Sequence, residues 1–352
     1  MLKNFIFGFS IYERVDKKMA KRIKAMVMAA GMGSRLEPIT LSMPKPLIPI
    51  MNKPLMDIIL SQLYSIGVRD VISNTYYLSN QIIERYKKNK LGINFNYIKE
   101  ETLSGTAGGL KKCQYFFEEG EDFIVLSGDV LTDADIQKGI EIHKKSGAIA
   151  TIGIKEISHD KISNFGVVVT DKNGYIQYFQ EKPPVEEAKS NTINTGIYIF
   201  NYKIFEYIPE NKFYDFAKDV FPKLLKENKI NTFIVDGYWS DVGTIEQYKQ
   251  SVLDVFNGLC NIGNIEIKET NIGNYVIGNT KLPKTCRIMG NNVIGDNCKL
   301  GEYILLNNCI VFDNAEIESG SEFINKIILP NATRKKSSKK TYQKKLLEHN
   351  KK

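Results

Sequence analysis

Two positively charged side chains, Arg35 and Lys45, lie in a stretch rich in glycine and proline at residues 31–49. The stretch follows an apolar run at 25–30 that is typical of a buried strand. Glycines let the backbone turn tightly and bring bare N–H groups close to a ligand, and the prolines on both sides of Lys45 stiffen the chain around it. A strand, a glycine turn and two fixed cations together indicate a cradle for a polyphosphate.

The stretch matches neither of two common nucleotide-binding motifs. The P-loop requires G-x-x-x-x-G-K-[ST], and Leu36 excludes the dinucleotide motif G-x-G-x-x-G. The stretch instead resembles the N-terminal signature of the sugar-1-phosphate nucleotidyltransferases, which runs G-x-G-x-R-L-x-P-x-T, then P-K-P, then K-P. Every element is present, the last at residues 53–54. The resemblance implies that Arg35 and Lys45 are catalytic. It also implies nucleotide contacts from Ala30, Gly31 and Gly33.

Two aspartates have the chemistry of magnesium ligands. Asp129 follows a glycine and an apolar run at 123–127, at the end of an expected strand. A transfer between two phosphate-bearing substrates needs cations to offset their repulsion, and Mg²⁺ prefers carboxylate oxygens and retains several waters. In the family that the chain resembles, an Asp in G-D-x-L and a second Asp, at the position of Asp241, bind the metal. We therefore expect Mg²⁺ as the cofactor, held by Asp129 and Asp241.

Short segments downstream of this strand resemble the family's sugar-phosphate site. Gly128 leaves room for a ligand beside the strand end. By resemblance, Glu181 contacts sugar hydroxyls, Lys182 contacts the sugar phosphate and Asn194 contacts the sugar. Each segment is a weak signal alone, but their order and spacing after Gly128 favour a single site.

A further glycine-rich patch at 105–109 resembles the L-G-T-A-G segment that packs beside the nucleobase in guanylyl- and uridylyltransferases, with Ser104 in place of the usual leucine. A carboxylate at Glu101 would accept the N1 and N2 hydrogens of guanine, which uracil lacks, although it could equally be solvated. The patch G-T-A-G-G, followed later in the chain by an expected β-helix, most resembles the mannose-specific guanylyltransferase branch of the family. This resemblance favours GTP and mannose 1-phosphate as substrates, and glucose-1-phosphate uridylyl- or thymidylyltransfer is the alternative. The expected nucleotide contacts in the patch are Gly105, Thr106 and Ala107.

The elements that position these residues alternate between strand and helix up to about residue 129. The sequence predicts strands at 25–30, 70–73, 93–98 and 123–127, and helices at 54–66 (capped by Asn52), 81–88 and 110–117. This alternation predicts a Rossmann-like α/β domain with a mostly parallel sheet, whose ligands bind at the carboxyl ends of the strands. Shorter strands from 136 to 257 predict a sugar-binding extension of the same domain.

Large apolar residues recur every six positions beyond about residue 261. Ile324 fits two periods after the last of them, although Glu318 breaks the series. A period of six favours a short left-handed parallel β-helix of hexapeptide repeats. Its expected role is a cap or an assembly surface, so a homo-oligomer is one expected state. The series comprises Val276, Leu282, Ile288, Ile294, Leu300, Leu306 and Phe312.

The chain of 352 residues has a formal net charge of +8. All of that excess lies in 331–352, so the rest of the chain is formally neutral. Neutrality argues against a nucleic-acid partner, and no apolar run approaches the about 18 residues that span a bilayer, which argues against a membrane partner. We expect a disordered extension at 1–18, a nucleotidyltransferase domain at 19–258, the β-helix at 259–330 and a basic disordered tail at 331–352.

The five cysteines form no C-x-x-C pair. This spacing argues against zinc and a disulfide framework and favours a reducing cytoplasm. An alternative function of another class is an inactive regulatory or scaffold subunit that assembles through the β-helix. The intact set of charged residues argues against that alternative: Arg35, Lys45, Asp129, Lys182 and Asp241.

Overall fold

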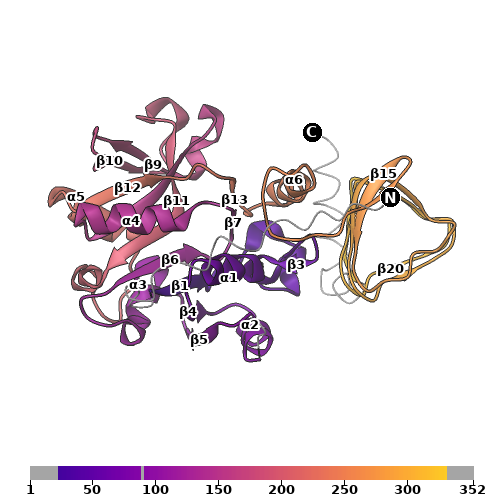
Figure 1. Cartoon of the computed structure of the whole chain (residues 1–352), viewed down its shortest axis with the longest axis horizontal. Coiled ribbons are helices and arrows are strands. Elements are labelled where there is room, and N and C mark those ends of the chain that lie inside the picture. Colours follow the sequence, from indigo (N-terminus) through magenta and orange to yellow (C-terminus); the bar gives the residue numbers. More distant parts are fainter. Residues whose placement is uncertain (1–22, 89–90, 331–352) are drawn as a thin grey trace, which may run out of the picture.

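The structure, a computed structural model, describes residues 23–88 and 91–330. The expected extension at 1–18 and the basic tail lie outside these ranges. Figure 1 shows a layered α/β body at one end, short strands wound into a triangular outline at the other, and helix α6 (Ile245–Phe256) between them. No helix within the described ranges is long and apolar enough to cross a bilayer. All five cysteines are free thiols.

A nine-stranded sheet forms the centre of the body. Its strands are β1 (Lys24–Ala29), β4 (Asp70–Thr75), β5 (Asn94–Lys99), β6 (Asp122–Ser127), β8 (Ala150–Glu156), β9 (Gly166–Thr170), β10 (Ile176–Glu181), β11 (Thr192–Asn201) and β12 (Ile230–Ile234). The main order is β10-β9-β11-β6-β1-β4-β5, with β8 joining β11 to β12. Strands β6, β1, β4 and β5 are all parallel. The predicted α/β fold with a mostly parallel central sheet is confirmed.

Helices cover both faces of this sheet because successive residues of a strand point to opposite sides. Ala25 and Val27 of β1 belong to the same buried cluster as Leu60 of α1. Met26, between them, belongs to the opposite cluster with Leu110 of α3. A strand buried on both faces is apolar throughout, which is why 25–30 could be recognised from sequence. The helices are α1 (Leu55–Ser65), α2 (Ser79–Tyr86), α3 (Gly105–Lys112), α4 (Ile136–Ser146) and α5 (Phe221–Lys226).

Two predictions about helix ends are wrong. Helix α3 begins at Gly105 rather than at 110, so the glycine-rich patch is its first turn. Asn52 does not cap α1: its φ is 62°, Pro54 occupies the N-cap position, and no side chain caps the helix. The Asn52 amide instead donates to the carbonyl of Ile294, 2.7 Å away in the C-terminal strands. A contact between residues this far apart in the chain has no local signal.

The C-terminal strands pair mainly in parallel with partners 17 or 18 residues further along the chain. Val276 pairs with Val293, and Ile288 pairs with Leu306. The hexapeptide repeat and the left-handed turn stay predictions. The strands are β14 (Lys268–Thr270), β15 (Gly273–Ile277), β16 (Arg287–Ile294), β17 (Lys299–Leu300), β18 (Leu305–Asn307), β19 (Ile310–Val311), β20 (Glu316–Ile317), β21 (Glu322–Ile324) and β22 (Ile327–Ile328).

The extension of the six-residue series to Ile324 is wrong. Leu306 pairs with Phe323, so the spacing here is 17 residues, and Ile324 is 46% exposed. The wound strands also share a core with the α/β body, because Phe312 and Tyr248 of α6 lie in one buried cluster with ring centroids 6.2 Å apart. This shared core fixes the C-terminal strands against the body.

Candidate active site

A cavity of about 330 Å³ opens at the carboxyl ends of the parallel strands. Several of its lining residues carry no sequence motif, including Asn74, Glu100, Leu103, Phe213 and Asp215. It also brings together seven residues from the predicted site, which come from four segments of the chain: Ala30, Gly31, Lys45, Gly105, Thr106, Gly128 and Asp129.

An ion pair between Lys45 and Asp129 lies in the wall of this cavity. The Lys45 Nζ atom is 2.5 Å from Asp129 Oδ2, and the two side chains are 10% and 33% exposed. Burial raises the pKa of Asp129, but the charge of Lys45 and hydrogen bonds from Lys45 and Ser127 outweigh burial, so this pKa lies below its ordinary value. Asp129 is therefore a carboxylate at neutral pH, with Lys45 held beside it.

Gly33 positions Lys45 and does not line the cavity. Its φ is 65°, and its carbonyl accepts a 2.9 Å hydrogen bond from Thr40. A Cβ atom on Gly33 would lie 3.2 Å from the Cβ atom of Lys45 and 3.0 Å from Thr40. Glycine at this position therefore lets the lysine segment approach closely, which differs from the nucleotide contact expected from the resemblance.

Asp241 reaches the same region from a small two-stranded sheet. Strand β13 (Trp239–Asp241) is antiparallel to β7 (Val130–Thr132), and Asp241 pairs with Val130, the neighbour of Asp129. Burial, followed by the negative charge of Asp129, raises the pKa of Asp241 to about 6. Two carboxylates from adjacent strands therefore repel each other at the edge of the cavity.

Arg35 lies beside Asp241 rather than in the cavity lining. It is exposed in a short 3₁₀ helix at Ser34–Leu36. A Cβ atom on Gly243 would lie 2.9 Å from the carboxylate of Asp241 and 3.3 Å from the guanidinium of Arg35. The charges of Lys45 and Arg35 both lower the pKa of Asp241. The two predicted cations and the two predicted carboxylates thus form one charged group.

The residues present fit a magnesium ion. Among the residues that the structure describes, no three His, Cys, Asp or Glu side chains are grouped to hold a metal. Mg²⁺ does not need such a group, because it is commonly held by one or two carboxylates together with substrate phosphates and waters. A divalent cation between Asp129 and Asp241 would also relieve the repulsion that raises the pKa of Asp241.

Three residues predicted to bind the sugar phosphate do not line the cavity. Burial, and also the charge of Asp215, raises the pKa of Glu181, although Lys182 opposes this. The Lys182 side chain is 62% exposed, with Nζ 3.8 Å from Glu181 Oε1. The Asn194 amide donates to the hydroxyl of Tyr198 at 3.1 Å. Asp215 lines the cavity, so Glu181 lies within electrostatic reach of the cavity wall, and the sugar-phosphate contacts of all three residues stay predictions.

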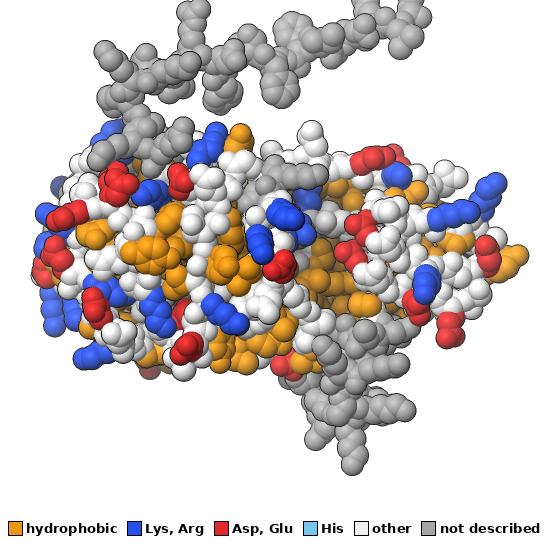
Figure 2. All heavy atoms as spheres, turned by 90° about the horizontal axis from the view of Figure 1, so that it is seen from below, with side chains coloured by type: hydrophobic (Ala, Val, Ile, Leu, Met, Phe, Trp, Pro, Cys, Tyr) orange, Lys and Arg blue, Asp and Glu red, His pale blue; other side chains and the backbone are white. Residues whose placement is uncertain are grey.

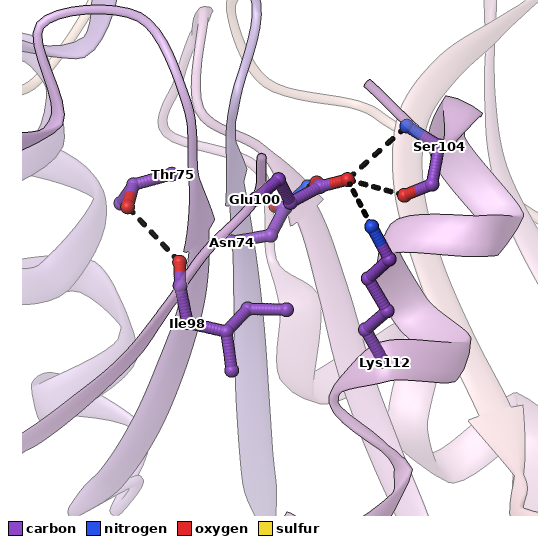
Figure 3. A network of polar contacts seen from close by, with 6 residues as sticks. All are labelled: Asn74, Thr75, Ile98, Glu100, Ser104 and Lys112. Atoms are coloured by element: carbon purple, nitrogen blue, oxygen red, sulfur yellow. Dashed lines mark hydrogen bonds and ion pairs between the residues drawn. The ribbon is translucent and has the colours of Figure 1, made fainter. Parts of the chain in front are cut away.

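The carboxylate on the other side of the cavity is Glu100 rather than Glu101. Figure 3 shows its side chain receiving hydrogen bonds from Ser104 and Lys112. The side-chain amide of Asn74 donates to the other carboxylate oxygen. The Asn74 amide lies 2.7 Å away, the Ser104 amide 3.1 Å and the Lys112 ammonium 3.2 Å. Glu100 is 1% exposed at its side chain, whereas Glu101 is exposed and does not line the cavity. The sequence alone could not show which of these two adjacent acidic residues lines the cavity.

The glycine-rich patch contacts the chain itself at 212–216. The carbonyl of Tyr214 accepts hydrogen bonds from the amides of Ala107 and Gly108, each at 3.0 Å. A Cβ atom on Gly105 would lie 2.4 Å from this carbonyl. The Thr106 hydroxyl donates to Asp215 at 2.9 Å. Gly105 and Thr106 therefore reach the cavity, whereas the Ala107 amide already has a partner.

Comparison with known proteins gives one consistent family. A family model described as nucleotidyl transferase matches residues 24–257. The chain is 35% identical to a UTP–glucose-1-phosphate uridylyltransferase from Synechocystis sp., over 87% of each chain. It is 30% identical to a probable mannose-1-phosphate guanylyltransferase from Oryza sativa subsp. japonica, over 87% of this chain and 86% of the relative. The crystal structure of a putative glucose-1-phosphate thymidylyltransferase from Bacillus anthracis matches with a TM-score of 0.61 and 25% identity, over 69% of this chain and 98% of that one.

Proposed function

Because this chain belongs to the nucleotidyl transferase family, as a sugar-1-phosphate nucleotidyltransferase, we propose that it transfers the uridylyl group of UTP to glucose 1-phosphate. The products are UDP-glucose and pyrophosphate. Among the relatives named above, the uridylyltransferase has the higher identity, at 35% over 87% of both chains. The second candidate is transfer from GTP to mannose 1-phosphate, supported by the 30% identity to the rice guanylyltransferase.

The state of Glu100 and Glu101 supports uracil over guanine. Guanine recognition by a carboxylate needs free oxygens that face the N1 and N2 hydrogens of the base. The oxygens of Glu100 already accept hydrogen bonds from three neighbouring residues, and Glu101 is exposed outside the cavity lining. Uracil has one N–H donor and two carbonyl acceptors, which backbone groups can satisfy. The proposal of uracil as the base rests on this lack of a free carboxylate from Glu100 or Glu101 in the cavity lining.

The reaction requires no protein nucleophile. An oxygen of the sugar phosphate attacks the α-phosphorus of the NTP in line, a new P–O bond forms, and the bond to pyrophosphate breaks. The pyrophosphate leaves with the electron pair. Catalysis then consists of positioning both substrates and stabilising the charge that develops on their phosphates. No serine or cysteine with an activating base is needed for this chemistry.

The charged group at the cavity supplies these two effects. The Lys45 ammonium is held at the wall by Asp129, so it is placed to bind a phosphate oxygen without reorganising. Arg35, exposed beside Asp241, offers a second cation for the pyrophosphate that leaves. Asp129 and Asp241 would hold Mg²⁺, which when bound neutralises and orients phosphate oxygens. Glu181, Lys182 and Asn194 would orient the sugar phosphate.

The C-terminal strands serve as a rigid cap in this proposal. Their parallel pairing at 17- or 18-residue intervals supports the left-handed hexapeptide β-helix predicted from sequence. The core shared through Phe312 and Tyr248 supports a structural role for this part of the chain. Light scattering of the full chain tests whether these strands also mediate assembly. A homo-oligomer would support an assembly surface, and a monomer would support the capping role only.

A substrate panel tests the proposed function. The full chain is incubated with Mg²⁺, each of UTP, GTP, ATP and dTTP, and the 1-phosphates of glucose, mannose, galactose and N-acetylglucosamine. Pyrophosphate release is measured in each combination. The proposal predicts the fastest release with UTP and glucose 1-phosphate. Fastest release with GTP and mannose 1-phosphate would establish the second candidate, and no release in any combination would favour the inactive scaffold subunit.

A further inference from the structure

We propose that Phe213, with Leu103 beside it in the lining of the same cavity, forms an apolar platform on which the nucleobase of the NTP stacks. The inference rests on the proposed function only in that an NTP enters this cavity. It assigns a binding role to the segment at 212–215, which has no recognisable motif.

The first observation is the exposure of two large apolar side chains at one cavity. Phe213 is 69% exposed and Leu103 is 41% exposed, and both line the cavity that contains Lys45 and Asp129. Large apolar groups exposed together beside a cavity indicate a ligand surface. A nucleobase presents a flat aromatic face that such a surface can cover.

The second observation is that the backbone around Phe213 is fastened in place. The amide of Tyr214, the next residue, donates to the carbonyl of Ser104 at 2.8 Å. The Tyr214 carbonyl accepts hydrogen bonds from the amides of Ala107 and Gly108 in α3. The Thr106 hydroxyl bonds Asp215 at 2.9 Å and accepts from the Phe216 amide at 2.9 Å. The aromatic ring is therefore presented by a fixed segment, which lowers the entropy lost when a ligand stacks on it.

The third observation places this surface away from the charged group. Leu103 and the residues that fasten the Phe213 segment lie at the start of α3, which follows β5. Asp129 follows β6, and β5 is separated from β6 by β1 and β4 in the sheet. An NTP bound with its phosphates at Lys45 would therefore place its base toward Leu103 and Phe213.

Binding measurements on matched variants test the inference. The variants are Phe213→Ala, Phe213→Tyr and Tyr115→Ala, since Tyr115 is 71% exposed and lies outside the cavity lining. Calorimetry measures UTP and inorganic tripolyphosphate separately, without a sugar phosphate, and circular dichroism checks the fold. Stacking of one base on an aromatic side chain predicts about tenfold weaker UTP binding in Phe213→Ala. Tripolyphosphate binding should be unchanged, and Phe213→Tyr and Tyr115→Ala should match the wild type.

Steady-state kinetics give a second readout. Phe213→Ala should raise the KM for the NTP and leave the KM for the sugar 1-phosphate unchanged. Unaltered UTP binding in a folded Phe213→Ala would overturn the inference and leave the proposed function intact. A change confined to the sugar phosphate, or an equal loss for tripolyphosphate, would also overturn it. A wild type that binds none of the four NTPs would overturn the proposed function and this inference together.

Discussion

The ammonium of Lys45 lies 2.5 Å from the carboxylate of Asp129, although 84 residues separate them in the chain. One group is a predicted phosphate ligand and the other a predicted metal ligand, so each holds the other in place before substrates arrive. Both lie at the carboxyl ends of the parallel strands, where α/β sheets bind ligands. The chemistry proposed for the chain depends on this pair.

Replacing Lys45 should reduce turnover more than binding. Lys45→Ala removes a preorganised positive charge from the phosphates, and loss of one such group typically lowers kcat by about 10²- to 10³-fold. Lys145→Ala, an exposed lysine on α4, is the matched control and should have no effect. Steady-state kinetics separate kcat from KM. A small rise in KM with unchanged kcat would contradict a role for Lys45 beside the transferring phosphate.

Replacing either aspartate should change the dependence of activity on magnesium. Asp129→Asn is expected to abolish activity with Mg²⁺ while the fold remains intact. Asp241→Asn should raise the Mg²⁺ concentration for half-maximal activity by at least about tenfold, because even groups outside a metal's ligand set alter its affinity by roughly 10- to 100-fold. Exposed Glu119→Gln is the control. Near wild-type activity in Asp129→Asn would remove Asp129 from the metal site.

The first glycine of α3 should be required for stability. Gly105 and Gly120 have nearly equal φ values, 78° and 79°, but an added Cβ would lie 2.4 Å from the Tyr214 carbonyl only at Gly105. Left-handed strain costs about 1–2 kcal/mol in either alanine variant, and the clash should add about 1–3 kcal/mol in Gly105→Ala. Denaturant titration measures both free energies of unfolding. Equal losses would contradict the close approach of 212–215 to α3.

Adjacent glutamates give a matched test of base recognition. Glu100→Gln should lower the free energy of unfolding by about 1.5–3 kcal/mol, because the ion pair with Lys112 is lost and one acceptor oxygen becomes an NH2 group that faces the donors of its neighbours. Glu101→Gln should change stability by no more than about 0.5 kcal/mol and leave the order of preference among the four NTPs unchanged. If Glu101→Gln changed which NTP is preferred, the predicted role of Glu101 in recognising guanine would be restored.

Sequence patterns predicted the parts of the fold that local chemistry determines. The run at 25–30 is apolar because its strand is buried on both faces, and Lys45 and Asp129 lie in motifs whose spacing is visible along the chain. Phe213 and Asp215 could not be found in this way, because their place in the site depends on hydrogen bonds to α3, about a hundred residues earlier. The prediction that Ile324 continues the apolar series was wrong for a related reason. Strand register, and not a fixed period, determines which side chain is buried.

Following the α-phosphorus of the NTP tests the central claim most directly. The full chain is incubated with UTP labelled at the α-phosphorus, glucose 1-phosphate and Mg²⁺, and the products are separated. The account predicts that all transferred label appears in UDP-glucose, with one unlabelled pyrophosphate released for each. Label recovered in UMP without a nucleotide sugar, or no product under conditions in which UTP is bound, would contradict uridylyl transfer to glucose 1-phosphate at this site.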